Sequence, residues 1–384
     1  MADSSVLILG GGVGGVVTAN EVRRRLGREH RVVLIDRETA HVFSPSLLWV
    51  QVGLRDPGKI SRDLSLLKKK NTEVVHGEVE SIDPESKKVR VSGQNLEADF
   101  LVVSLGAQLV PEQIPGLAEA GYNLYSLDGA SKMRDAQKEL SRGHLVVLVA
   151  RTPFKCPAAP YEAAMLLDGD LRKRNLRGCV SMALYSPEPG PMGVAGPDVS
   201  AGVRQLVEER GIDYFPGRQV TEVYPASKTL RFADGEQAGF DLLAYIPPHA
   251  APPVVKSAGM TGESGWVPVD RHTMETRFPG VYAIGDITTI PLTIGSPLPK
   301  AGVFAHRQGE AVAQSIAAQV NGRDHPGAFD GHGECFVEVG GGKAAFGRGN
   351  FYGEPVPTIK LYKPGRHWHA AKVLFEKDWF RRWF

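Results

Sequence analysis

The first forty residues pass from one apolar run to another through a glycine-rich turn. Residues 6–9 are apolar, residues 10–15 are mostly glycine, a helical stretch reaches about Leu26, and residues 31–35 are again apolar and lead to Asp36. Short apolar runs bounded by glycines are typical of buried strands in a parallel sheet, because both faces of such a sheet are covered. The order strand, turn, helix, strand predicts a βαβ unit at the start of the chain.

The positions of the glycines make this unit more specific. Gly10, Gly12 and Gly15 fit the pattern GxGxxG, and Asp36 follows 21 residues after Gly15. The first glycine permits the tight turn, the second lets backbone approach a pyrophosphate, and the third lets the helix pack on the strand. The helix N-terminus stabilises the phosphate charge, and the acid accepts the ribose hydroxyls. A glycine-rich turn without a ligand is the alternative, but both strands and the acid favour dinucleotide binding.

Two later segments indicate which dinucleotide binds. Residues 100–103 form an apolar strand that ends in a turn with Gly106, and a second strand ends at Gly285 and Asp286, ahead of a helical stretch at about residues 301–321. In this order they resemble the second and third FAD contacts of flavoproteins with two dinucleotide-binding domains. The resemblance implies that Asp286 holds the ribityl chain and that the helix directs its positive end at the flavin ring.

The middle of the chain repeats the nucleotide-binding pattern without its glycines. Residues 145–149 and 180–185 have the pattern of strands, but prolines and Cys156 occupy the turn at 150–160, and the second strand ends in Ser-Pro-Glu-Pro. We therefore predict a second Rossmann-like domain that has lost the nicotinamide pocket. This argues against NADH dehydrogenases, disulfide reductases and ferredoxin reductases.

Together these patterns predict an α/β fold with two tandem Rossmann-like domains of the FAD/NAD(P)-binding, glutathione-reductase-like kind. Residues 1–111 and 249–328 are expected to form the FAD-binding domain, residues 112–248 the second domain, and residues 329–384 a C-terminal region. A chain of 384 residues is long enough for two or three domains of about 100–200 residues.

Composition and charge exclude several classes of protein. Hydrophobic residues make up 42% and charged residues 23%, which are globular values. The net charge of +2 gives no global basic field, so nucleic acid is not an expected partner. No apolar run approaches the roughly 18–20 residues that span a bilayer, and no secretory signal is visible, so we expect a cytoplasmic protein. Three cysteines are too few for a disulfide framework, and in a reducing compartment they favour a redox or metal role.

Two of the cysteines carry a family resemblance. The segment Lys-Cys-Pro-Ala-Ala-Pro-Tyr-Glu around Cys156 and the segment Gly-Glu-Cys-Phe around Cys335 resemble the redox-cysteine segments of sulfide:quinone oxidoreductases and flavocytochrome c sulfide dehydrogenases. Residues 299–302 match as well. Several of these enzymes have a third cysteine near the position of residues 122–128, where this chain has none. Cys179 is expected to be a small buried core residue.

The resemblance implies a role for each cysteine in the oxidation of sulfide to zero-valent sulfur or polysulfide. Hydrosulfide attacks Cys156 of a disulfide between the two cysteines, which leaves a persulfide on Cys156 and expels Cys335 as a thiolate. Glu162 would be the general base, although an acid in the first turn of a helix opened by Pro160 is also explained by the helix dipole. Two unrelated buried thiols are the alternative; a metal site would need further Cys or His ligands that are not nearby.

The resemblance also implies a set of FAD contacts. Ser44 lies near the position where flavocytochrome c bonds its FAD through a cysteine, so non-covalent FAD is expected here. Lys300 would stabilise the negative charge of the reduced flavin. The expected cofactor-binding residues are Gly10, Gly12, Val13, Gly15, Asp36, Arg37, Ser44, Pro45, Val79, Gly106, Gly285, Asp286, Lys300, Ala301 and Gly302.

The last 19 residues, 366–384, are aromatic and basic and hold three of the five tryptophans. We interpret them as a helix that dips into a membrane surface, with Arg381 and Arg382 at anionic headgroups. A helix docked on the protein's own core or on a partner subunit is the alternative. Near one face of this helix fall Trp368, Ala371, Phe375, Trp379 and Trp383.

These features predict a flavoenzyme that takes electrons from sulfide or a small persulfide and passes them to membrane quinone. Phe336 and Phe375 are the expected quinone contacts. The protein would be peripheral, on the cytoplasmic face of the cell membrane, and a homo-oligomer is left open. The alternatives are a type II NADH:quinone dehydrogenase, a sulfide dehydrogenase with a soluble cytochrome acceptor, and a non-catalytic FAD-binding scaffold.

Overall fold

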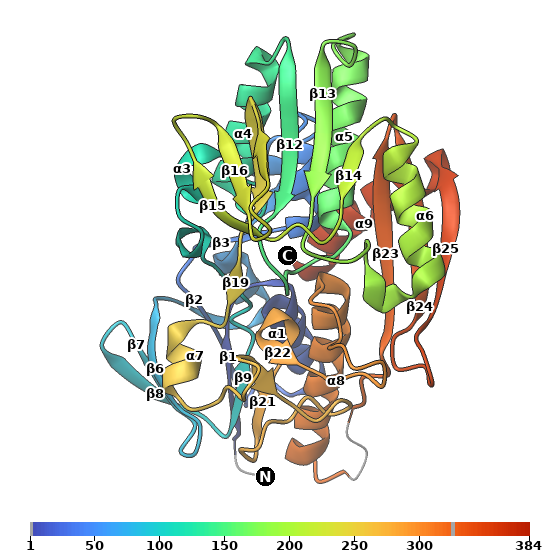
Figure 1. Cartoon of the computed structure of the whole chain (residues 1–384). Helices are drawn as coiled ribbons and strands as arrows, with labels where there is room; N and C mark the ends of the chain where they lie inside the picture. The colour runs from blue at the N-terminus through green and yellow to red at the C-terminus, as the bar shows by residue number, and fades with distance from the viewer. Residues whose placement is uncertain (1–2, 324–326) are drawn as a thin grey trace.

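Two five-stranded parallel sheets form the body of the molecule. The computed structural model describes residues 3–323 and 327–384, and Figure 1 shows the two sheets one above the other. The lower sheet has the order β21 (Val281–Ala283), β9 (Phe100–Val103), β1 (Ser5–Leu9), β2 (Arg31–Asp36) and β5 (Glu73–His76). The upper sheet has the order β11 (Tyr122–Asn123), β18 (Leu242–Ile246), β12 (Gly143–Val149), β13 (Val180–Tyr185) and β14 (Asp213–Phe215).

Helices cover both sheets. Helix α1 (Val13–Arg25) packs along α8 (Gly302–Val320) on the lower sheet. The upper sheet is flanked by α4 (Leu127–Glu139), α5 (Ala159–Lys173) and α6 (Pro197–Glu208). The shorter helices are α2 (Leu47–Val50), α3 (Leu117–Ala120) and α7 (Pro253–Ser257).

Small sheets join these parts. Antiparallel three-stranded sheets are formed by β6 (Val79–Asp83), β7 (Lys88–Val91) and β8 (Gln94–Glu97), and by β15 (Val220–Tyr224), β16 (Thr229–Phe232) and β17 (Gln237–Gly239). The antiparallel two-stranded pairs are β3 (Ala40–Val42) with β4 (Ser61–Asp63) and β10 (Gln108–Leu109) with β19 (His249–Ala250), whereas β20 (Val267–Pro268) pairs in parallel with β22 (Thr288–Thr289).

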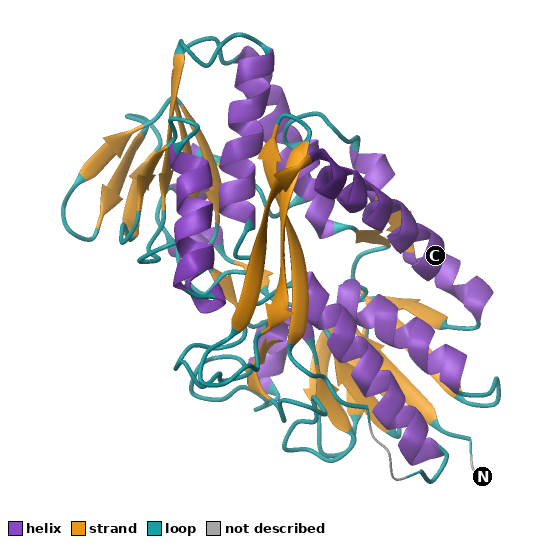
Figure 2. Ribbon diagram, turned by 90° about the vertical axis from the view of Figure 1, so that its right-hand side faces the viewer, coloured by secondary structure: helices purple, strands orange, loops and turns teal. Residues whose placement is uncertain are grey.

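The C-terminal part is a three-stranded antiparallel sheet followed by a helix. Its strands are β23 (His332–Gly340), β24 (Lys343–Asn350) and β25 (Thr358–Gly365), and α9 (Arg366–Trp383) follows directly. Figure 1 shows this sheet beside both parallel sheets, and Figure 2 shows its strands running between the upper and lower halves. Because β23 packs against α5, and α9 against β24, the C-terminal part reaches the start of α5.

The apolar runs of the sequence form the central strands of the two parallel sheets. Val6, Leu7, Ile8 and Leu9 of β1 are fully buried, as expected of a strand covered on both faces. Strand β13 has the predicted bounds, and the helix expected at 301–321 is α8, Gly302–Val320. The predicted α/β fold class with two nucleotide-binding-like sheets is therefore confirmed. Over residues 3–323 and 327–384, no helix is both long and apolar enough to cross a bilayer.

Candidate active site

The glycine-rich turn between β1 and α1 is fixed by close packing. Gly10 has a φ of +103°, and a Cβ there would lie 2.3 Å from the carbonyl oxygen of Ser104. A Cβ on Gly15 would lie 1.8 Å from the carbonyl oxygen of Gly10. A Cβ on Gly12 would meet nothing within 4 Å. The first and third glycines are thus required by the protein's own backbone, while the second leaves room for a ligand.

A cavity of about 1350 Å³ opens at this turn. It exceeds the roughly 300–1,000 Å³ of an ordinary small-molecule site, so it can hold a dinucleotide and a further ring. Of the predicted site residues, those that line it are Gly10, Gly12, Val13, Asp36, Arg37, Ser44, Pro45, Val79, Gly106, Cys156, Glu162, Gly285, Asp286, Ala301, Gly302, Cys335, Phe336 and Phe375.

Three features of the cavity wall fit FAD. Helices α1 and α8 both begin at the wall, at Gly12 and Ala301, whose side chains cannot bond the first N–H groups, so those groups and the helix dipoles remain available to anionic ligand atoms. The Asp286 carboxylate has a buried Oδ1 without a hydrogen-bond partner among the described residues, which suits a sugar-like hydroxyl. The Asp36 carboxylate accepts from the N–H of Gly11 and keeps free lone pairs for a ribose.

Lys300 does not lie where we expected it. Its ammonium donates to the carbonyl oxygens of Asp286 and Thr288 at 2.8 Å and 2.9 Å and lies 3.5 Å from the centroid of the Trp266 ring. It lines a separate small pocket behind the cavity wall, because a buried ammonium needs these acceptors. Burial lowers its pKa to about 8. Its carbonyl oxygen accepts from the N–H of Cys156 at 2.6 Å, so its backbone positions the cysteine.

Cys156 and Cys335, 179 positions apart in the sequence, both line the cavity, where the Cys335 thiol donates to the carbonyl oxygen of Phe336 at 3.3 Å. Cys156 is held in the left-handed region, with a φ of +52°, just before α5. A non-glycine residue in this conformation is uncommon and is often found at functional sites. The Cys156 thiol, burial and the charge of Glu162 raise the pKa of Cys335. Both sulfurs are free thiols.

Glu162 is a buried ion-pair partner rather than an isolated carboxylate. It lies in the first turn of α5, after Pro160, as predicted. Its Oε1 accepts from the ammonium of Lys372 at 2.9 Å and from the N–H of Glu338 at 2.8 Å. Although burial opposes it, the charges of Glu162 and Glu338 raise the pKa of Lys372.

Sequence reasoning missed Lys372, Glu338 and His369. His369 and Lys372 share a face of α9 at a spacing of three residues, and His369 Nδ1 lies 2.9 Å from Glu338 Oε1. The helical spacing could have grouped these two residues. Nothing in the pattern shows that their partners lie on α5 and β23, because those contacts are made only in the folded chain.

Helix α9 buries more of its aromatic side chains in the protein than we predicted. Trp379 and Trp383 are each 3% exposed and pack in the core of the lower half, so the expectation that they dip into lipid was wrong for these two residues. The indole Nε1 of Trp379 donates to Nε2 of the buried His41 at 3.1 Å. Large apolar groups that remain exposed on α9 are Leu374, 64%, and Phe375, 43%.

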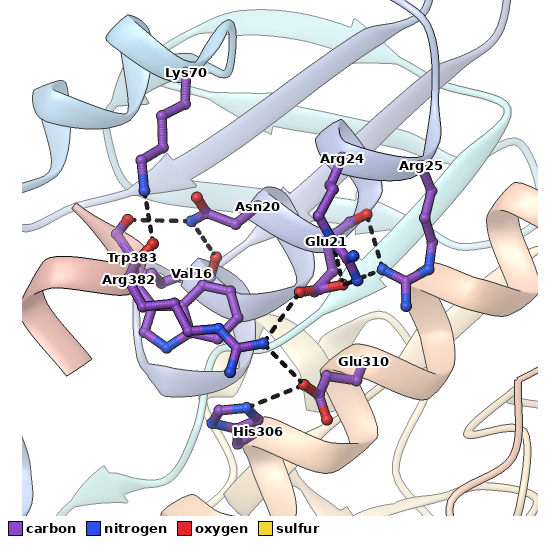
Figure 3. A network of polar contacts seen from close by, with 10 residues as sticks. All are labelled: Val16, Asn20, Glu21, Arg24, Arg25, Lys70, His306, Glu310, Arg382 and Trp383. Atoms are coloured by element: carbon purple, nitrogen blue, oxygen red, sulfur yellow. Dashed lines mark hydrogen bonds and ion pairs between the residues drawn. The ribbon is translucent and has the colours of Figure 1, made fainter. Parts of the chain in front are cut away.

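The end of α9 is fastened to the lower half by polar contacts. Asn20 donates to the carbonyl oxygen of Trp383 at 3.3 Å, and Lys70 donates to that of Arg382 at 2.9 Å (Figure 3). The Arg382 guanidinium lies 3.8 Å from both Glu21 and Glu310. These contacts cap the last carbonyls of the helix and hold it over the cavity, which Arg382 also lines.

Two further expectations concern Cys179 and the second nucleotide fold. Cys179 is exposed rather than buried, because it precedes β13 in the loop where the Leu176 carbonyl accepts its N–H.

Tyr161 is fully buried at the start of α5. Its hydroxyl donates a hydrogen bond to the Glu188 carboxylate at 3.0 Å, beyond the end of β13. Burial raises the pKa of Glu188 to about 7. The turn between β12 and α5 holds prolines and Cys156 in place of the glycines of a nucleotide-binding turn. Over the described residues, no group of three or more His, Cys, Asp and Glu side chains could hold a metal.

Two nucleotide-binding-like sheets, a glycine turn and a thiol pair in one cavity define a flavin-dependent oxidoreductase. The chain belongs to the pyridine nucleotide-disulphide oxidoreductase family, whose match covers residues 4–149 and 170–309. FAD is the cofactor that this family and the cavity wall indicate. The match omits the segment with Cys156 and everything from β23 onward.

Individual relatives cover these remaining segments. The sulfide-quinone reductase of Aquifex aeolicus is 29% identical over an alignment of 393 positions that covers 97% of this chain and 89% of that protein. The mitochondrial sulfide:quinone oxidoreductase of Mus musculus is 24% identical over 92% of this chain and 80% of its own length. The crystal structure of the Aquifex aeolicus sulfide:quinone oxidoreductase superposes with a TM-score of 0.90 at 26% identity, covering 99% of this chain and 91% of that one. The resemblance inferred from the cysteine segments is therefore confirmed.

Proposed function

We propose that this chain oxidises sulfide to zero-valent sulfur and passes the electrons to a membrane quinone. The observation that carries the proposal is that two free thiols from distant segments line the one cavity that suits FAD. The likeness to sulfide:quinone oxidoreductases over nearly the whole chain supports it. The turn after β12, which lacks the glycines of a nucleotide-binding turn, counts against NADH as the electron donor.

The two cysteines divide the chemistry between them. When they are joined as a disulfide, hydrosulfide attacks Cys156, the S–S bond breaks, and Cys335 leaves as a thiolate. Cys156 then carries a persulfide, and the pair has gained the two electrons that the sulfide lost. When bound, FAD would supply a two-electron acceptor for the pair and a donor to quinone. Glu162, which lines the cavity, would take the proton of hydrogen sulfide or of a thiol.

The wall beyond Cys335 suits a quinone ring. Phe336 and Phe375 line the cavity with ring centroids 6.3 Å apart, and Phe346 lies 5.0 Å from Phe336. Aromatic side chains stack on a planar ring and exclude water from it. The exposed residues Leu374 and Phe375 would bring this wall to the membrane surface, with the protein peripheral on its cytoplasmic side.

The cysteine mechanism is tested by anaerobic titration of the flavin absorbance with sulfide. Sulfide should bleach the wild-type flavin, and a short-chain quinone should restore its colour. Cys156→Ser and Cys335→Ser should bind FAD and lose sulfide-driven bleaching at least a hundredfold, because each removes one sulfur of the pair. Cys179→Ser is the matched control, since Cys179 is exposed and outside the cavity lining. Full bleaching in either cavity variant, or bleaching of the wild type by NADH instead of sulfide, would contradict the proposal.

A further inference from the structure

A buried cluster of charged side chains lies beside Cys335, and the cysteine chemistry does not account for all of it. Glu162, Glu338 and Lys372 are 2%, 1% and 5% exposed, whereas the side chain of His369 is 27% exposed. Lys372 donates to Glu162 at 2.9 Å, and His369 Nδ1 lies 2.9 Å and 3.0 Å from the two carboxylate oxygens of Glu338. Glu162 and Lys372 line the cavity. The cluster therefore leads from the cavity wall to the protein surface.

The charges of this cluster balance only if it holds one additional proton. Two carboxylates, Glu162 and Glu338, face the single ammonium of Lys372, and an uncompensated charge is strongly unfavourable at this degree of burial. The charges that act on Glu338 are those of Lys372 and His369 from α9 and of Glu162 from α5. Burial raises the pKa of Glu338. The balancing proton thus resides on the more deeply buried Glu338 at rest and can pass to His369 along the hydrogen bond between them.

The proposed reaction consumes a proton at this wall. Hydrosulfide, quinone and one proton give zero-valent sulfur and quinol, so one of the two quinol protons comes from hydrosulfide and the other from water. The aromatic side chains of Phe336, Phe346 and Phe375 on the wall cannot carry a proton. The Lys372–Glu162 pair is titratable and lies at the same wall.

We propose that Glu338 and His369 form a proton inlet, which carries protons from solvent to the Lys372–Glu162 pair at the cavity wall. His369 exchanges protons with water, Glu338 holds the proton inside the protein, and the ion pair delivers it into the cavity. Both residues act through Lys372 and Glu162 and are positioning residues for proton transfer. The inference rests on the proposed function, because quinone reduction creates the demand for the proton.

The test separates the two half-reactions of the FAD-loaded protein by anaerobic stopped flow. His369→Ala and Glu338→Gln should be bleached by sulfide within twofold of the wild-type rate. Re-oxidation by a short-chain quinone should be at least tenfold slower in both, because proton supply fails. Added imidazole should restore the rate of His369→Ala and leave Glu338→Gln unchanged. His367→Ala is the matched control, because His367 is exposed on the first turn of the same helix.

A second readout does not depend on turnover. The infrared spectrum of the resting protein should show a protonated-carboxyl band that disappears in Glu338→Gln, and an unchanged band would overturn the assignment of the proton. If His369→Ala is re-oxidised at the wild-type rate, or if its slow re-oxidation is not restored by imidazole, the proton inlet is overturned while the sulfide:quinone activity stands. A wild-type flavin that sulfide does not bleach, or that quinone does not re-oxidise, would instead overturn the proposed function and with it the need for an inlet.

Discussion

At the scale of single residues, His41 shows how the fold fixes a protonation state. Its Nδ1 lies 2.9 Å from the carbonyl oxygen of Gly11, and its Nε2 lies 3.1 Å from the indole nitrogen of Trp379. A carbonyl only accepts a hydrogen bond and an indole N–H only donates one, so the ring is neutral with its proton on Nδ1. Burial lowers the pKa of His41 to about 4. One neutral imidazole thus joins the glycine-rich turn to the C-terminal helix.

This protonation state predicts a loss of stability in acid. The unfolded chain binds a proton at His41 near pH 6.5, but the folded chain does so only near pH 4, so the folded state loses stability as the pH falls through this window. At about 1.4 kcal/mol per pH unit the loss approaches about 3 kcal/mol. His41→Asn cannot take up this proton. Its unfolding midpoint in denaturant, followed from pH 7 to pH 4, should therefore fall less than that of the wild type. Equal pH dependence in both proteins would contradict the assignment.

At the scale of elements, helix α9 is part of the core and not only a surface feature. Trp379, Phe380 and Trp383 are buried against the lower half, whereas Leu374 on the same helix is 64% exposed. Truncating a buried aromatic side chain typically costs about 3–5 kcal/mol, and truncating an exposed side chain about 0.5 kcal/mol or less. Trp379→Ala should therefore lower the midpoint of thermal unfolding and loosen FAD, measured by the release of flavin fluorescence. Leu374→Ala should leave both unchanged, and a wild-type midpoint in Trp379→Ala would show that α9 is not docked.

The sequence predicted the bounds of helices and strands well, but it did not predict which distant residues contact one another. An apolar run between glycines or prolines defines a strand locally, which is why β13 and α8 fell within a residue of their predicted bounds. The periodicity of residues 366–384 predicted the helix, but not that Trp379 would find His41, 338 positions away. The same limit applies to Glu162 and Lys372, 210 positions apart, because an ion pair leaves no local pattern. Cys335 could be placed with Cys156 only through a family resemblance, and the structure brings both residues to the wall of one cavity.

At the scale of the whole molecule, the cavity is assembled from parts that no single segment contains. The lower sheet supplies the glycine turn, the start of α5 supplies Cys156, and β23 and α9 supply Cys335 and the aromatic wall. The C-terminal part has to reach the start of α5 before the two thiols can meet. The proposed chemistry therefore depends on the last fifty residues, which contribute Cys335 and the aromatic wall.

The wall that these residues form also determines how the molecule would meet a membrane. The net charge is only +2, so attraction to an anionic surface has to be local. Leu374, Lys377 and Arg381 are exposed on α9 at spacings of three and four residues, which places an apolar and two basic side chains on one face. Exposed Leu54 lies beside this helix, because its neighbour Arg55 pairs with Glu376 at 2.8 Å.

Leu374→Glu should therefore weaken membrane binding without disturbing the fold. The variant places a charge where an apolar side chain would enter the lipid interface, so sedimentation with vesicles that contain anionic lipid and quinone should fall at least tenfold. Bleaching by sulfide and re-oxidation by a water-soluble quinone should stay at wild-type rates, because Leu374 does not line the cavity. Val356→Glu is the matched control, since Val356 is 58% exposed on the segment between β24 and β25. If both variants bind vesicles like the wild type, the membrane-facing surface is not α9; if Val356→Glu alone is released, it lies on the β24–β25 side of the molecule.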